Sequence, residues 1–132
     1  MRKQLINPPQ VHDTNKFGIS QAVIDTADAI VYISGQVDWD ANYQVSCHTV
    51  EGQLKKALAN LSTVLDASGS SVESLLSTRF YIRGEIEEFI GDIAPIIVQF
   101  LGESRPALTV IGVSSLASKE TLVEIEATAA LK

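Results

Sequence analysis

The sequence predicts an α+β fold, in which a mixed β-sheet carries two helices on one of its faces. Two segments with apolar residues every three or four positions predict the helices, and several segments with alternating apolar and polar residues predict the strands. The 132 residues contain no internal repeat and no linker-like change of composition. We therefore expect a single domain over residues 1–132.

The first strands are predicted before residue 40. A short strand is expected at residues 2–6, and two apolar runs flank the sequence DTAD at residues 25–28. Two such runs around a turn are typical of a β-hairpin. Gly35 lies inside the second run and indicates a break or a bulge in that strand.

The first helix is predicted from Ser46, as its N-cap, to Gly69, directly after its C-terminus. Its apolar stripe consists of four leucines at helical spacing: Leu54, Leu58, Leu61 and Leu65. Polar residues off this stripe are expected to face water, among them Lys55, Lys56, Asn60 and Asp66.

Residues 75–84 alternate and predict a strand that ends at Gly84. One face of this strand would carry Leu76, Thr78, Phe80 and Ile82, and the other Ser77, Arg79, Tyr81 and Arg83. The two final strands are predicted at residues 107–113 and 121–130. In the last one, the expected core residues are Val123, Ile125, Ala127 and Ala129.

The second helix is predicted between these strands, over residues 85–102. Its apolar stripe is formed by Phe89, Ile93, Ile97, Phe100 and Leu101. Pro95 inside the segment predicts a kink, or a restart of the helix after Asp92. Gly102 is expected to end the helix.

The sheet face without helices is predicted to mix opposite charges with large apolar groups. Its expected residues are Tyr32, Arg79, Tyr81, Leu108, Glu124 and Glu126. A monomer would expose this face to water, whereas a symmetric oligomer would bury part of it and pair the charges. The composition of the face favours the oligomer.

Composition excludes several function classes. The net charge is −6, and Lys and Arg form no cluster longer than a doublet, which argues against a nucleic-acid partner. No run of 18 apolar residues predicts a membrane span. The N-terminal segment lacks the apolar core of a signal peptide, so we expect a cytoplasmic protein. With Cys47 as its one cysteine, the chain has no internal disulfide and no cysteine-based metal cluster.

Motifs for metal or cofactor binding are incomplete. The sequence DWDAN at residues 38–42 resembles half of a calcium loop, but Tyr43 and Thr49 replace the required Gly and Glu, so we expect a solvated turn. Trp39 in this turn is expected to pack over a neighbouring subunit. His12 and His48 have no partners at metal spacing. We expect no metal and no cofactor.

Glu124 is the strongest candidate for chemistry because carboxylates are disfavoured in the middle of a strand. It could orient or deprotonate a water molecule. The alternative is a structural ion pair between Glu124 and Arg79.

The segments AIVYISGQV, STRFYI, RPALTVIGVSSL and LVEIEATA, with the helix before STRFYI, resemble the RidA/YjgF (reactive intermediate deaminase, L-PSP) family from about Ile19 to Ala130. The resemblance implies a chorismate-mutase-like fold and a homotrimer with ligand clefts between subunits. It also implies hydrolysis of enamine and imine intermediates to 2-oxo acids and ammonia, without a cofactor.

The resemblance also assigns cleft positions. The family's serine and glutamate are present as Ser34 and Glu124, but its carboxylate-binding arginine, tyrosine and asparagine fall on Leu108, Ile19 and Ile93. Divergent subgroups without this arginine carry others that correspond to Arg79 and Arg105. Arg79 is the better replacement anchor, because Arg105 precedes Leu108 by three residues and is expected to be structural or interfacial.

Three functions follow from these expectations. The first is an enamine or imine deaminase with an altered substrate, because Leu108 replaces the carboxylate-binding arginine. The second is a trimeric module that binds a small molecule in its intersubunit clefts, or another protein, without catalysis. The third is an endoribonuclease or translation inhibitor, which the charge of −6 disfavours.

Overall fold

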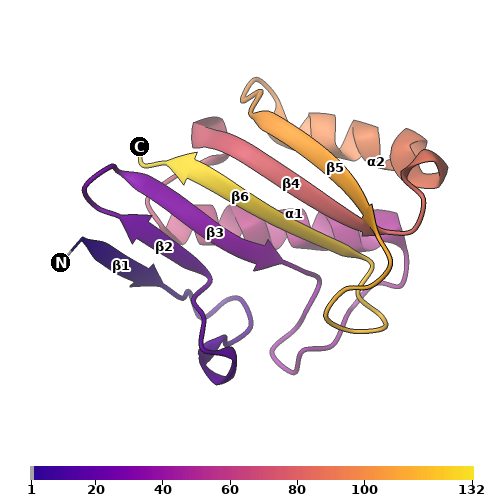
Figure 1. Cartoon of the computed structure of the whole chain (residues 1–132), viewed down its shortest axis with the longest axis horizontal. Helices are drawn as coiled ribbons and strands as arrows, with labels where there is room; N and C mark the ends of the chain where they lie inside the picture. The colour runs from indigo at the N-terminus through magenta and orange to yellow at the C-terminus, as the bar shows by residue number, and fades with distance from the viewer. Residues whose placement is uncertain (1) are drawn as a thin grey trace.

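The computed structural model describes residues 2–132, which form one sheet of six strands, two α-helices and two 3₁₀ helices (Figure 1). In chain order the elements are β1 (Lys3–Ile6), η1 (Asn15–Phe17), β2 (Ala22–Asp25), β3 (Ile30–Gln36), α1 (Val50–Ala67), η2 (Val72–Ser74), β4 (Leu75–Arg83), α2 (Ile86–Leu101), β5 (Ala107–Val113) and β6 (Val123–Ala130). The predicted order of strands and helices is confirmed.

The sheet is mixed, and both α-helices lie behind it in the view of Figure 1. Its strand order is β1-β2-β3-β6-β4-β5, and every neighbouring pair is antiparallel except β4 and β5. The crossover through α2 makes β5 parallel to β4, as a strand-helix-strand connection requires. The predicted α+β fold with two helices on one face is confirmed.

The core lies between the helices and the sheet. The leucine stripe of α1 is buried against alternate residues of the central strands, with Phe80 and Ile125 fully buried. On β6 all four predicted core residues are buried, because the alternation of the strand places them on the helix face: Val123, Ile125, Ala127 and Ala129.

The N-terminus of α1 differs from the prediction. Thr49 is the N-cap, and its side chain accepts a hydrogen bond from the backbone N–H of Gly52 at 3.1 Å. Ser46 does not cap the helix, because its hydroxyl and backbone N–H both donate to Asp38. The C-terminal prediction is confirmed: Gly69 follows the helix in the left-handed region, with φ of 74°.

The start of β4 also differs from the prediction. Leu76 is 49% exposed, and Leu75 is buried in its place. The pairing with β6 shifts register between Leu75 and Ser77, which reverses the alternation at this end of the strand. From Thr78 onward the predicted alternation is confirmed by the burial pattern.

Pro95 does not restart α2, which is continuous from Ile86 to Leu101. Pro95 removes a backbone donor for the carbonyl of Gly91. Both residues lie on the exposed side of the helix, where water can satisfy that carbonyl. The helix ends at Gly102, as predicted.

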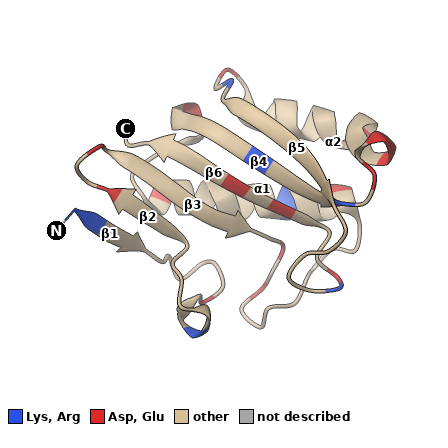
Figure 2. Ribbon diagram, in the orientation of Figure 1, with Lys and Arg blue, Asp and Glu red and all other residues tan. Residues whose placement is uncertain are grey.

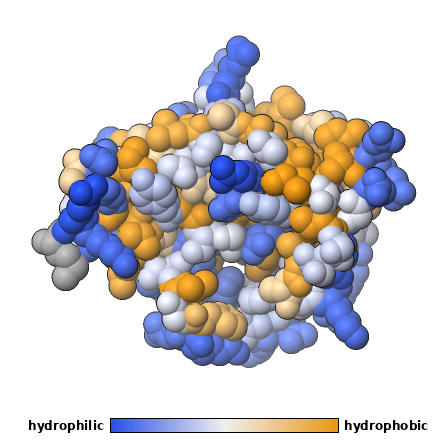
Figure 3. Space-filling model, viewed as in Figure 1, coloured by the Kyte–Doolittle hydropathy of each residue, from blue (hydrophilic) through white to orange (hydrophobic). Residues whose placement is uncertain are grey.

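The sheet face opposite the helices, which we call the open face, contains five of the six predicted residues: Tyr32, Arg79, Tyr81, Glu124 and Glu126. Figure 3 shows hydrophobic and hydrophilic residues intermixed over it. Leu108 is the exception, because its partner on β4 is the buried Thr78, and paired residues share a face. Leu108 therefore lies on the helix side of the edge strand β5.

Substitution of Gly112 by alanine is expected to destabilise the fold by about 1–3 kcal/mol. A Cβ at this position would lie 2.6 Å from the backbone oxygen of Gly84, which cannot move without shifting the end of β4. Chemical denaturation of both proteins measures the difference. Gly91→Ala is the matched control, since a Cβ there meets nothing within 4 Å, and it should stabilise α2 by up to about 1 kcal/mol. Equal stabilities of the Gly112 variant and the native protein would contradict the expectation.

Candidate functional site

The predicted irregularity at Gly35 is a β-bulge between β3 and β6. Ile33 pairs with Ala127 and Gln36 pairs with Ile125, so two residues of β3, Ser34 and Gly35, oppose the single residue between these partners. Bulges bend a strand and often lie beside binding sites, because they change the direction of nearby side chains.

The side chain of Glu124 lies directly over the bulge. A Cβ on Gly35 would be 2.6 Å from Cδ of Glu124 and 2.8 Å from its Cγ, closer than real contacts allow. The absence of a side chain at position 35 therefore makes room for this carboxylate.

Glu124 is partly buried, and its carboxylate has no salt bridge and accepts no side-chain hydrogen bond within residues 2–132. Burial raises the pKa of Glu124, and repulsion by Glu126 raises this pKa further. The raised pKa makes the ionised carboxylate a stronger base than an exposed glutamate.

The alternative of an ion pair between Arg79 and Glu124 is wrong. Arg79 instead lies 3.5 Å from Glu126, and the hydroxyl of Tyr81 donates to the same carboxylate. This hydrogen bond and burial raise the pKa of Tyr81. Figure 2 shows the corresponding red segments on β6 beside a blue segment on β4. Glu126 therefore takes the pairing interactions and leaves Glu124 free for other contacts.

Glu124 forms part of the lining of a small hollow with a volume of about 190 Å³, which we call the Glu124 hollow. The rest of its lining is aromatic, aliphatic or glycine: His12, Phe17, Ile19, Gly35, Val37, Trp39 and Ala117. A single carboxylate in otherwise apolar surroundings is typical of sites that bind small molecules.

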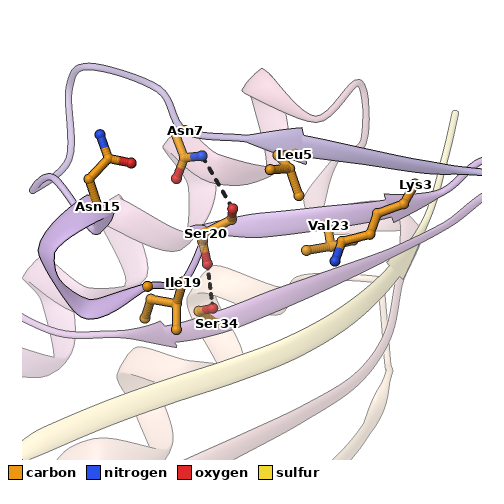
Figure 4. A pocket seen from close by; sticks show the side chains of 9 residues that line it. Lys3, Leu5, Asn7, Asn15, Ile19, Ser20, Val23 and Ser34 are labelled. Atoms are coloured by element: carbon orange, nitrogen blue, oxygen red, sulfur yellow. Dashed lines mark hydrogen bonds between the residues drawn. The ribbon is translucent and has the colours of Figure 1, made fainter. Parts of the chain in front are cut away.

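A larger and more polar hollow of about 510 Å³ adjoins it and shares Ile19 (Figure 4). Figure 4 shows Ile19, Ser20 and Ser34 close together, with Lys3 at the opposite end. The hydroxyl of Ser34 donates to the backbone oxygen of Ser20 at 2.6 Å, and Asn7 donates to the Ser20 hydroxyl at 3.4 Å. Ser34 therefore ties β3 to the segment before β2 as well as lining this hollow.

The aromatic wall of the Glu124 hollow comes from the 3₁₀ helix η1, which carries Phe17, and from two irregular segments, which carry His12 and Trp39. Trp39 packs edge-on against His12, with ring centroids 5.1 Å apart, and donates from Nε1 to the hydroxyl of Thr121 at 3.1 Å. Phe17 lies 6.4 Å from Trp39. Trp39 thus packs against residues of its own chain and remains partly exposed, and its predicted contact with a neighbouring subunit stays a prediction.

In the predicted solvated turn at residues 38–42, Asp40, Ala41 and Asn42 are exposed as expected, but Asp38 is not. Asp38 is only 4% exposed, and its carboxylate accepts hydrogen bonds from Ser46 and from the backbone N–H of Cys47. This carboxylate organises the loop that carries Trp39.

Buried amides connect the aromatic wall to the bulge. Gln36, the residue after the bulge, donates from Nε2 to Oε1 of Gln21 at 2.8 Å, and Gln21 donates to the backbone oxygen of His12 at 2.9 Å. Both glutamines are 1% exposed. His12 is also buried, and burial lowers the pKa of its imidazole.

The predicted site residues do not all come together. Ile19 and Glu124 share the Glu124 hollow, and Ser34 lies beside it. Ile93 is on the buried side of α2, where it packs into the core, so it presents no surface to a ligand. Leu108 lies on the helix side of β5, across the sheet from Glu124.

The two candidate arginines lie outside the hollow. Arg79 contacts Glu126, and Arg105 is exposed between α2 and β5 in the left-handed region, with φ of 49°. Neither contributes to the lining of the hollow.

Glu124→Gln is expected to stabilise the fold above the raised pKa of Glu124. Well below pH 4.5, the ordinary pKa of a glutamate, Glu124 is protonated in both the folded and the unfolded chain. The variant and the native protein should therefore differ little in stability at such a pH. As the pH rises, the unfolded glutamate loses its proton first, and native stability falls until the folded carboxylate also ionises. Denaturation of both proteins from pH 3 upward, at about one-unit steps, measures this difference. A gap that does not widen with pH would contradict it.

No helix within residues 2–132 has the length and hydropathy needed to span a membrane. In the same residues, no three His, Cys, Asp or Glu side chains gather in a way that would hold a metal ion.

Comparison with known proteins identifies relatives along nearly the whole chain. The profile of the endoribonuclease L-PSP family matches residues 15–131. The 2-iminobutanoate/2-iminopropanoate deaminase of Rattus norvegicus is 32% identical over 111 residues, which are 83% of this chain and 77% of the rat protein.

Two solved structures show the same architecture. An L-PSP protein from Entamoeba histolytica is 29% identical, with a TM-score of 0.85, and the match covers 98% of this chain and 99% of the other. The Rid-family protein YyfB from Yersinia pestis is 34% identical, with a TM-score of 0.72, over 99% and 100% of the two chains. This chain therefore belongs to the endoribonuclease L-PSP family, which is the RidA/YjgF family that its sequence resembles.

Proposed function

We propose that this protein hydrolyses small imines or enamines to carbonyl compounds and ammonia, with Glu124 as the base. The observation that carries the proposal is an unpaired, partly buried carboxylate in an apolar hollow, where burial and Glu126 raise its pKa. The rat relative, whose name states a deaminase activity on 2-imino acids, supports the reaction class.

The reaction needs one group that moves protons. Water adds through its oxygen to the imine carbon, and the π electrons of the C=N bond move to nitrogen. Glu124 takes a proton from the water and gives one to nitrogen, which yields a carbinolamine. Glu124 then relays the hydroxyl proton to nitrogen, C=O forms, and the C–N bond breaks to release ammonia. An enamine enters this sequence after it gains a proton at carbon and loses one from nitrogen.

The substrate in this proposal lacks the carboxylate of the 2-imino acids. Leu108 stands at the position of the family's carboxylate-binding arginine, and neither Arg79 nor Arg105 lines the hollow. Loss of a charge-assisted hydrogen bond to a carboxylate costs about 1.5–3 kcal/mol of binding free energy.

The site is proposed to be completed in a homotrimer. Leu108 and Glu124 lie on opposite sides of the sheet, so a ligand can contact both only between two copies of the chain. The mixed apolar and charged open face supports such an assembly. Light scattering should then give three times the chain mass of 14.2 kDa.

The direct test is ammonia release from small and larger imines that lack a carboxylate, with 2-aminoacrylate generated in situ as the carboxylate-bearing comparison, which should be hydrolysed more slowly. Semicarbazide, which traps the free imine, serves as the competitor. The protein should accelerate release of ammonia and reduce the semicarbazide adduct. No acceleration for any small or large substrate would overturn the catalytic proposal.

A second candidate is a trimeric module that binds a ligand or partner without catalysis. Aliphatic residues at two family cleft positions, Ile19 and Leu108, favour it, whereas Ile93 is buried in the core. Ligand-induced thermal stabilisation without ammonia release would support it. RNA cleavage is disfavoured, because the net charge is −6 and Figure 2 shows no continuous basic stripe on the face in view.

A further inference from the structure

We propose that the Glu124 hollow binds an organic cation, namely a protonated amine or iminium group attached to an apolar or aromatic body. The inference rests on the proposed function for its location, because it concerns the same hollow, and it names the class of ligand. It does not require that catalysis occurs.

The charge of the hollow favours a cationic ligand. Glu124 is the only acidic side chain in its lining, which contains no Lys or Arg, and burial lowers the pKa of His12, which disfavours a positive charge on that imidazole. A ligand carboxylate would lie near this carboxylate without a compensating cation. An ammonium or iminium group would instead gain a charge-assisted hydrogen bond from its N–H to Glu124.

Two cationic side chains of the molecule, Arg79 and Lys16, have other partners. Arg79 pairs with Glu126 at 3.5 Å, and Lys16 places its Nζ 3.8 Å from the ring centroid of Tyr43. Neither side chain contributes to the lining of the hollow. The negative charge of Glu124 is therefore left for a ligand to neutralise.

The aromatic wall of the hollow also favours a cationic ligand. Phe17 and Trp39 line the hollow, and the faces of aromatic rings attract cations. The same aromatic cluster already holds one ammonium group, because Lys16 lies over Tyr43 and 5.2 Å from the Phe17 centroid. Tyr43 is not part of the lining, so Lys16 binds to a different part of the cluster.

The size of the hollow limits the body of the ligand to about one ring. The volume of about 190 Å³ compares with a cavity of roughly 150 Å³ that is known to hold benzene in another protein. One six-membered ring with a short arm therefore fits, and the benzylammonium ion is a suitable probe. For the matching imine, hydrolysis would read R–CH=NH₂⁺ plus water giving R–CHO plus NH₄⁺.

The experiment is a calorimetric titration of the native protein with three probes that share a ring: benzylammonium chloride, benzyl alcohol and sodium phenylacetate. Benzylammonium should bind about 10-fold or more tightly than benzyl alcohol, and phenylacetate should bind most weakly. Equal or tighter binding of phenylacetate would overturn the inference.

Variants locate the site. Glu124→Gln should reduce benzylammonium affinity about 10-fold while changing benzyl alcohol little. Phe17→Leu, at a position 48% exposed and so safe for folding, should lower the preference for the cation over the alcohol about 3-fold or more. Asp66→Asn removes the same charge from the exposed end of α1 and should have no effect. Equal effects of the Glu124 and Asp66 variants would also overturn the inference.

The two proposals fail in different ways. Selective binding of benzylammonium without ammonia release from any imine would leave the inference standing and remove the deaminase proposal. Hydrolysis of a carboxylate-free imine without preference for benzylammonium over benzyl alcohol would do the reverse.

Discussion

Glu124→Gln is expected to lower the rate of imine hydrolysis by about 10²–10⁴-fold, the range for loss of a general base. Glutamine keeps the size of the side chain and its place over the bulge, but it cannot take a proton from water. Rates of ammonia release from in situ 2-aminoacrylate and from a carboxylate-free imine measure the loss. A rate within about 3-fold of the native value would show that another group acts as the base.

Glu126→Gln is the matched control, because it removes a carboxylate two residues away on the same strand face. Glu126 contacts Arg79 and Tyr81 and does not line the Glu124 hollow. The rate should stay within about 10-fold of the native rate. Because Glu126 raises the pKa of Glu124, the rising limb of the pH–rate profile should move to lower pH in this variant. A greater loss here than in Glu124→Gln would reverse the assignment of the base.

Gly35→Ala is expected to cost at least about 100-fold in hydrolysis while the fold is retained. The new methyl group would lie 2.6 Å from Cδ of Glu124, so the carboxylate must leave its place over the bulge. The backbone at Gly35 is not in the left-handed region, so alanine adds no backbone strain. Activity assays with circular dichroism melting curves measure both effects.

The double variant Gly35→Ala, Glu124→Gln tests whether both changes act through one carboxylate. If they do, its rate should be close to that of Glu124→Gln alone, because the second change has nothing further to remove. Gly91→Ala, where a Cβ meets no neighbour, should leave the rate unchanged. A folded Gly35→Ala protein with native activity would contradict the role given to the bulge.

Local patterns in the sequence predicted the elements because alternation and helical spacing report which side chains a strand or helix buries. These local patterns do not predict the register in which neighbouring strands pair. Leu108 was assigned to the wrong face because its side follows from the parallel register with Thr78, which no local pattern encodes. Leu76 was misplaced for a similar reason, a register shift beside it.

The candidate site was only partly predictable. Glu124 was identified because a carboxylate in mid-strand is unusual, and Gly35 because glycine interrupts an apolar run. The aromatic wall is not predictable from the sequence, because His12 and Trp39 lie in irregular segments and Phe17 in a single 3₁₀ turn, with no spacing rule that connects them. The available signal was that these three side chains lie outside the predicted strands and helices, since aromatic side chains are costly to leave in water.

The amide chain from Gln36 through Gln21 to His12 has a consequence for the thermodynamics of binding. It fixes one wall of the hollow to the sheet before any ligand arrives. A ligand then loses little affinity to the conformational entropy of ordering a loop, which otherwise costs about 0.5–1.5 kcal/mol for each immobilised side chain. We therefore expect this wall to select ligands by shape as a preorganised surface, without a conformational change that adapts it to different ligands.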